Sequence, residues 1–104
     1  MFSWMRKNRR LPEGAGDGVL RARANVRAIA ADGGLAVFDT VRGGVFRSNA
    51  VGAEIWRELI ERQRDPNSVA EELAGQFGIS TVQARRDVAS FVGQLREEKL
   101  VIMQ

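Results

Sequence analysis

Apolar and polar residues along this chain follow two different periods, and the change falls near residue 49. Before that point, Asn25–Ala30 and Leu35–Thr40 are short, partly β-branched runs, separated by an Asp-Gly turn signal at residues 31–34. A second turn signal, Arg42-Gly43-Gly44, precedes Val45–Ser48, in which apolar and polar residues alternate. The pattern predicts a three-stranded β-meander with Val45–Ser48 as its last strand and as an edge of the sheet.

After Asn49 the apolar residues recur about every 3.6 positions, which is typical of helices. Asn49 is a good N-cap, and the first helix is expected to end near Arg64, before Pro66. Asn67 or Ser68 is expected to cap a second, shorter helix, because Ser68 and Glu71 fit a capping box. Gly78 is expected to end that second helix.

A third helix is predicted from Ser80 to about Lys99, since Ser80 and Gln83 form another capping box. Leu100–Ile102 then closes the chain as a short extended segment. The predicted fold is α+β and winged-helix-like, with a three-stranded N-terminal β-meander followed by three α-helices (β-β-β-α-α-α). We expect residues 19–104 to form this domain and residues 1–18 to be a flexible basic tail and linker. The expected core stripe of the third helix is Ala84, Val88, Phe91 and Leu95.

Composition narrows the possible chemistry. The 104 residues suffice for one domain and include no His and no Cys, which excludes imidazole and thiolate metal sites and His-dependent nucleophiles. Composition leaves an oxygen-only Mg²⁺ or Ca²⁺ site possible, but the acidic residues never gather into a D-x-D-x-D-G loop. We expect no catalytic residues, no metal and no cofactor. No apolar run approaches the length of a membrane span, so we expect no membrane partner and a cytoplasmic location. The net charge of +3 is uneven, because residues 1–48 carry +5 and residues 49–104 carry −2.

The third helix has a second face beside its core stripe, on which Arg85, Ala89, Val92 and Arg96 recur at helical spacing. If Val45–Ser48 lies beside this face, the edge strand and the helix form a groove. An extended peptide could then add to the strand by main-chain hydrogen bonds, and its acidic residues would suit the arginines. Against this, exposed arginines are usually only solvated surface, and proteins often cover their own edge strands. The candidate peptide-binding residues are Val45, Phe46, Arg47, Ser48, Arg85, Arg86, Ala89, Val92 and Arg96.

Several segments of the chain resemble the PqqD-like family. The most specific is Asn49-Ala50-Val51-Gly52-x-x-Ile55-Trp56, and the likeness spans roughly residues 25–102. It also includes Gly33–Asp39, Gly43–Asn49, Ser68–Leu73, Phe77–Ser80 and Asp87–Leu95.

This resemblance implies a peptide chaperone, also called a recognition element for ribosomally synthesised, post-translationally modified peptides. Such a protein binds the leader segment of a precursor peptide as an added strand and presents the precursor to a maturation enzyme. Carried over to this chain, the strand is Val45–Ser48 and the helix face is that of Arg85, Ala89, Val92 and Arg96. Ser48 stands where the family usually has a larger apolar residue, which predicts a looser junction between strand and helix.

Three alternatives remain. A DNA-binding winged-helix regulator is suggested because Gly78–Asp87 resembles the start of a recognition helix. Nucleic acid is nevertheless disfavoured, since the helical half is net acidic and too few residues follow Lys99 to build a wing. An enzyme is the weakest class, because the sequence has no paired carboxylate pattern. Pairing of two copies through the edge strand leaves both a monomer and a homodimer open.

Overall fold

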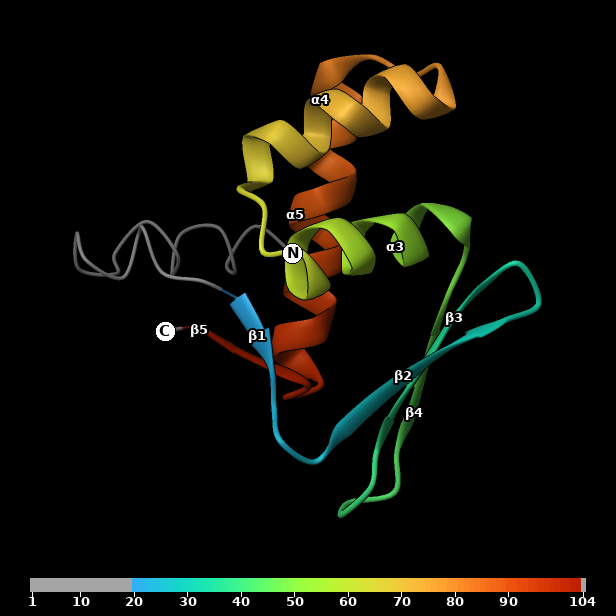
Figure 1. Cartoon of the computed structure of the whole chain (residues 1–104), viewed down its shortest axis with the longest axis vertical. Coiled ribbons are helices and arrows are strands. Elements are labelled where there is room, and N and C mark those ends of the chain that lie inside the picture. Colours follow the sequence, from blue (N-terminus) through green and yellow to red (C-terminus); the bar gives the residue numbers. More distant parts are fainter. Residues whose placement is uncertain (1–19, 104) are drawn as a thin grey trace.

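The computed structural model describes residues 20–103 and has the predicted α+β architecture (Figure 1). Three antiparallel strands form a sheet in the order β2-β3-β4, and three helical segments follow them in the chain. The strands are β2 (Val26–Ala31), β3 (Gly34–Asp39) and β4 (Val45–Ser48). The first helix is α3 (Ala50–Ile55), which continues without a break as the π-helical η1 (Trp56–Glu61). It is followed by α4 (Pro66–Phe77) and α5 (Thr81–Glu97). Strand β4 is an edge of the sheet, as predicted.

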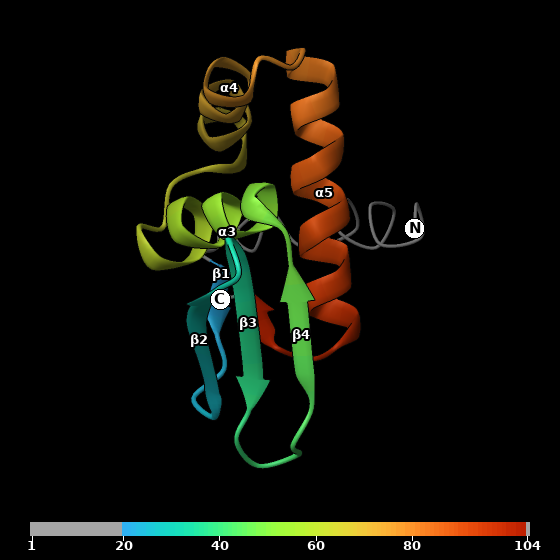
Figure 2. The same cartoon turned by 90° about the vertical axis from the view of Figure 1, so that its right-hand side faces the viewer.

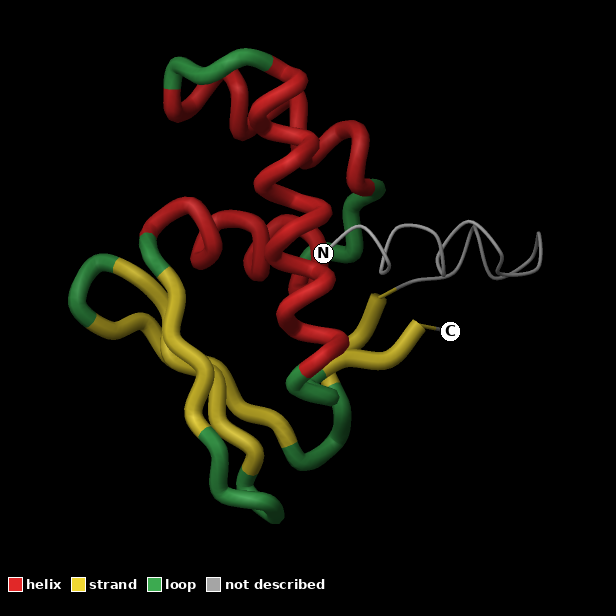
Figure 3. Tube along the Cα trace, turned by 180° about the vertical axis from the view of Figure 1, so that it is seen from behind, coloured by secondary structure: helices red, strands yellow, loops and turns green. Residues whose placement is uncertain are grey.

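A second, two-stranded sheet was not predicted. Strand β1 (Leu20–Ala22) pairs antiparallel with β5 (Val101–Met103), with Arg21 opposite Ile102, and Figure 3 shows this pair apart from the larger sheet. The sequence indicated an extended end of the chain but not its partner. Three residues are too few to show a period, and the pairing joins the two ends of the described chain. The predicted basic tail lies outside the described residues.

The two turns of the meander form for different reasons. Between β2 and β3, Asp32 and Gly33 have φ of 52° and 77°, the positive values that a tight two-residue hairpin turn requires. Between β3 and β4, the Asp39 carboxylate accepts hydrogen bonds from the backbone N–H of Arg42 at 2.7 Å and of Val41 at 2.9 Å. The N–H of Arg42 is the main reason why the pKa of Asp39 lies below its ordinary value. Ionised Asp39 therefore fixes the turn from which β4 begins.

Two of the predicted helix caps are confirmed. The Asn49 side chain accepts from the backbone N–H of Gly52 at 3.0 Å, and the Ser80 hydroxyl accepts from that of Gln83 at 3.0 Å. Gly78 ends α4 in the left-handed conformation with φ of 66°, as expected for glycine at this position.

The predicted cap of the second helix was wrong. Asp65 is the N-cap, accepting from the Ser68 N–H at 3.0 Å, and the helix begins at Pro66 rather than after Asn67. Proline fits the first helical position because that residue's N–H would have no intrahelical partner. The proline that appeared to separate two helices is therefore the first residue of the second.

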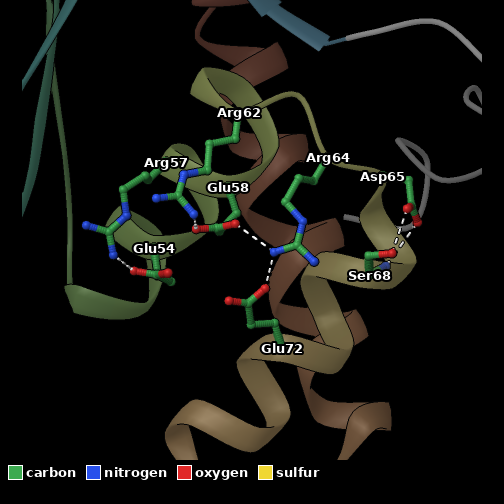
Figure 4. A network of polar contacts seen from close by, with 8 residues as sticks. All are labelled: Glu54, Arg57, Glu58, Arg62, Arg64, Asp65, Ser68 and Glu72. Atoms are coloured by element: carbon green, nitrogen blue, oxygen red, sulfur yellow. Dashed lines mark hydrogen bonds and ion pairs between the residues drawn. The ribbon is translucent and has the colours of Figure 1, made fainter.

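A buried carboxylate joins the end of η1 to α4 (Figure 4). Glu58 is only 2% exposed and accepts from Arg62 at 3.0 Å and from Arg64 at 2.7 Å. The hydrogen bond from Arg64 is the main reason why the pKa of Glu58 is lowered. Arg64 also bonds Glu72 on α4, so one guanidinium connects two helical segments. The helix that was expected to end near Arg64 ends at Glu61, and the residues after it form this link.

The hydrophobic core lies between the helices and one face of the larger sheet. The inner face contributes Val26, Leu35 and Val37, and α5 contributes the predicted stripe together with Val92. No helix of the described residues covers the opposite face of this sheet (Figure 2). Side chains of β4 that point inward therefore approach α5, and those that point outward reach solvent.

Candidate peptide-binding groove

The backbone of β4 has hydrogen-bonding groups that no other described segment uses. Strand β3 pairs with β4 in a register that places Val37 opposite Phe46, and the Asp39 N–H donates to the Gly44 carbonyl at 3.0 Å. Because bonded and non-bonded pairs alternate in an antiparallel ladder, Phe46 and Ser48 face β3 with their N–H and C=O groups. The N–H and C=O groups of Val45 and Arg47 then point away from β3, and within residues 20–103 no hydrogen bond takes them up.

A cavity of about 360 Å³ opens between the end of β4, the start of α3 and one side of α5. Its apolar part comes from Val51, Ile55 and Phe91, and its polar part comes from both walls. The remaining lining residues are Arg47, Ser48, Asn49, Gly52, Asp87, Ser90 and Gln94. An apolar side chain could thus be buried while polar groups bind its backbone or its tip.

A second, smaller cavity of about 140 Å³ lies at the other end of β4. Its lining includes Val45 and Phe46 from the strand and Glu98, which directly follows α5. Between the two cavities the Phe46 ring packs edge-on against Phe91, with ring centroids 5.9 Å apart. We call this whole surface, from Asn49 and Asp87 at one end to Val45 and Glu98 at the other, the β4–α5 groove. Figure 2 shows β4 and α5 running along its two sides.

The junction between β4 and α3 is tight rather than loose. A Cβ atom placed on Gly52 would lie 2.6 Å from the Ser48 Oγ and 2.8 Å from the Phe91 Cε1. The small Ser48 side chain therefore packs directly against a helix residue that has no side chain. This close approach brings β4, α3 and α5 together at one end of the groove.

The structure brings only part of the predicted site together. Of the predicted set, Arg47 and Ser48 line the larger cavity, and Val45 and Phe46 line the smaller one. None of the predicted residues of α5 lines either cavity. Val92 is 5% exposed and belongs to the core, Ala89 and Arg96 are half-buried, and Arg85 and Arg86 are exposed. The helix wall of the groove consists instead of Asp87, Ser90, Phe91 and Gln94.

This difference between the predicted helix face and the face that lines the cavity has a simple geometric cause. An α-helix turns by about 100° per residue, so the core stripe of α5 has two flanks. Residues 85, 89 and 96 lie on one flank, and residues 87, 90 and 94 lie on the other. The sequence pattern pointed to the first flank, but β4 lies beside the second. Peptide binding by the predicted α5 residues remains a prediction without geometric support.

Charges on the two walls of the groove differ in sign. The strand side carries Arg47, which is exposed and forms no ion pair within residues 20–103. Arg42 also lies on this side, but it is 3.9 Å from the Asp39 carboxylate. The helix side carries Glu98 and Asp87, and Asp87 accepts from the Gln83 amide at 2.9 Å. A bound peptide thus meets a cation on the strand and carboxylates on the helix.

Other kinds of site find little support in the described part of the chain. Residues 20–103 contain no cluster of three or more acidic side chains placed to hold a metal ion. Nor does any helix there have the length and apolar character needed to cross a membrane.

Comparison with known proteins bears directly on this geometry. The model of the family described as coenzyme PQQ synthesis protein D (PqqD) matches residues 34–101, which is most of the chain. This chain belongs to the PqqD family. The match includes β3, β4 and all the described helices, and so it contains both walls of the groove. No curated protein matches the chain.

Two solved structures share the fold of this PqqD-family chain. Lasso peptide synthetase B1 complexed with the leader peptide is 25% identical, with a TM-score of 0.74, over 80% of this chain and 96% of that one. TbiB1 in complex with the TbiA(beta) leader peptide is 21% identical, with a TM-score of 0.70, over 78% of this chain and 93% of that one. At that identity the second structure shows the fold alone.

Proposed function

We propose that this chain binds the leader segment of a precursor peptide as an added strand on β4 and presents the precursor to a maturation enzyme. The observation that carries the proposal is the open edge of β4 beside a cavity whose far wall is α5. The free N–H and C=O groups of Val45 and Arg47 would bond the peptide backbone. One peptide side chain would enter the cavity over Val51, Ile55 and Phe91.

The structure of lasso peptide synthetase B1 complexed with the leader peptide supports this proposal, because it has the same fold and this chain covers 96% of it at 25% identity. Membership of the PqqD family supports it as well. In this proposal the chain acts by binding alone, in the cytoplasm, without a cofactor and without a chemical step of its own. Residues 19–104 would act as the binding domain.

The test is a fluorescence-anisotropy titration with the labelled leader of any precursor peptide that is encoded beside this chain. Val45→Pro removes one free N–H of the open edge while leaving the bonds between β3 and β4 in place. A lost hydrogen bond and the obstructing ring together should weaken leader binding by about tenfold or more. Retention of full affinity in a folded Val45→Pro protein would refute strand addition at β4.

A matched proline variant is available on the other edge of the sheet. By the same alternation, the N–H of Ala30 on β2 points away from β3 and away from the groove. Ala30→Pro should therefore cost a similar amount of stability and leave leader binding within about twofold. A loss of binding in both variants would indicate a general effect of proline on the sheet.

The DNA-binding alternative is not favoured. The segment that follows α5 is β5, which pairs with β1 and so does not form a hairpin wing. A random DNA duplex in the same titration tests the alternative directly. DNA affinity that falls steeply with salt, without leader binding, would replace the proposal.

A further inference from the structure

The sheet face that no described helix covers continues to the open edge of β4. The register places Ile29, Ala36 and Arg47 in one row across the three strands and Arg27, Phe38 and Val45 in the next. These rows lie on the opposite face from Val37 and Phe46, because successive side chains of a strand alternate between faces. Figure 2 shows that none of the helices between residues 20 and 103 lies over this face.

This outer face is apolar and cationic. Ile29 is 51% exposed and Val45 is 56% exposed, and neither belongs to the hydrophobic core. Its two charged residues in the strand rows are Arg27 and Arg47, and no carboxylate is among the paired positions on this face. A strand added to β4 would lengthen both rows by one side chain each.

We infer that Arg47 and Val45 select the outward-facing residues of the leader: a carboxylate opposite Arg47 and, two residues away, an apolar side chain opposite Val45. This inference rests on the proposed function and specifies the class of peptide that the groove accepts. In an antiparallel addition the order along the leader is acidic residue, any residue, apolar residue. The residue between them points into the groove beside Phe46.

The geometry of the open edge sets these pairs. Val45 and Arg47 turn their backbone groups toward the peptide, so each stands directly opposite one peptide residue in a hydrogen-bonded pair. Side chains in such positions are about 5 Å apart at Cβ and interact directly. A pair of opposite charges there is worth about 1.5- to 5-fold in affinity. An apolar peptide side chain opposite Val45 would likewise extend the row that Phe38 and Val45 form across the sheet.

Arg47 is the cation placed for this role. Arg85 and Arg86 are outside the lining of the groove, and Arg42 is close to the Asp39 carboxylate. Arg27 lies on the outer face as well, but on β2, two strands away from the edge. It carries the same charge on the same face and therefore gives a matched control for Arg47.

The experiment is a selection from a displayed library of random peptides on three immobilised proteins: the unmodified chain, Arg47→Glu and Arg27→Glu. We expect the unmodified chain and Arg27→Glu to enrich an acidic residue two positions before an apolar one. Selection on Arg47→Glu should enrich Lys or Arg at the position that is acidic in peptides selected on the unmodified chain. One enriched peptide is then synthesised in two forms, with Glu or with Lys at that position. The Glu form should bind the unmodified chain about three- to tenfold more tightly than the Lys form, and the Lys form should bind Arg47→Glu more tightly.

The outcomes separate this inference from the proposed function. The enriched peptides that bind at the β4 edge are identified as those that no longer bind the Val45→Pro protein. If those peptides show the same charge preference on the unmodified chain and on Arg47→Glu, the inference is overturned and strand addition stays intact. Failure to enrich any peptide, together with failure of the encoded leader to bind, would overturn both. A charge preference that changes with Arg27→Glu as well would assign the effect to the net charge of the face and would also overturn the role of Arg47.

Discussion

The two flanks of the buried stripe on α5 differ in their charges and in their neighbours. The flank of Ser90 and Gln94 faces β4 and lines a cavity, whereas the flank of Ala89 and Arg96 does not contribute to it. Each flank has one small residue beside the core stripe, but the first carries Asp87 and the second carries Arg85 and Arg96. A helical period locates the buried stripe, but the side on which the sheet packs decides which flank becomes a binding surface.

The largest expected effect distinguishes the core stripe from both flanks. Val92 is 5% exposed, so Val92→Glu would place an unpaired carboxylate in the core. We expect it to cost at least about 3 kcal/mol and to unfold much of a small domain of ordinary stability. Circular dichroism during urea unfolding would measure this. Gln94→Glu, on the exposed groove side, should keep the fold, and a stable Val92→Glu protein would show that our assignment of the core is wrong.

The next effect compares the flanks directly through two adjacent, half-buried residues. Ser90→Trp would place an indole in the cavity of about 360 Å³ and should weaken leader binding by about tenfold or more. Ala89→Trp adds the same side chain on the other flank and should leave binding within about twofold. Both variants should unfold at similar urea concentrations. Anisotropy titrations check the pair, and equal losses of affinity would contradict the position of the groove.

Local signals account for the parts of the fold that the sequence predicted. The Asp32-Gly33 turn and the Asn49 and Ser80 caps each depend on a few neighbouring residues, and the change of period at Asn49 separates sheet from helices. The edge position of β4 followed from its place at the end of a meander. The resemblance to the PqqD family then added the expected mode of binding.

The features that sequence reasoning missed depend on contacts between distant segments. The pairing of β1 with β5 joins strands of three residues each from the two ends of the described chain. The Glu58 network combines η1, the linker and α4, and no short motif marks it. The groove wall at Ser90 and Gln94 required the packing of the sheet against α5. In contrast, the Asp65 cap was a local signal that could have been found, because Asp before Pro is a strong helix start.

The other wall of the groove can be perturbed through pH. Asp39 holds the turn before β4, and its pKa is lowered in the folded protein, chiefly by the hydrogen bond from the Arg42 N–H. A lowered pKa contributes stability above the ordinary pKa, and that contribution is lost as the pH falls through the folded value. Asp39→Asn should therefore unfold at a lower urea concentration than the unmodified chain at about pH 5 and approach it at about pH 2.5.

Urea midpoints at both pH values check this expectation. Glu58 and Asp65 also have lowered pKa values, so both proteins will lose stability in acid, and the informative quantity is the difference between them. A difference that stays constant between the two pH values would mean that ionised Asp39 does not hold the turn.

The smallest expected effect concerns the arginines that the sequence pattern favoured. Arg85 and Arg86 are exposed and outside the groove, so the double variant Arg85→Ala/Arg86→Ala should bind the leader within about twofold of the unmodified chain. The same titration with Arg47→Ala should show a larger loss, because Arg47 lies on the edge strand that receives the peptide. If instead the double variant loses leader affinity by about tenfold while Ser90→Trp does not, the peptide binds on the opposite flank of α5. If it loses only its affinity for DNA, and that affinity falls with salt, these arginines contact phosphates and the two flanks have separate roles.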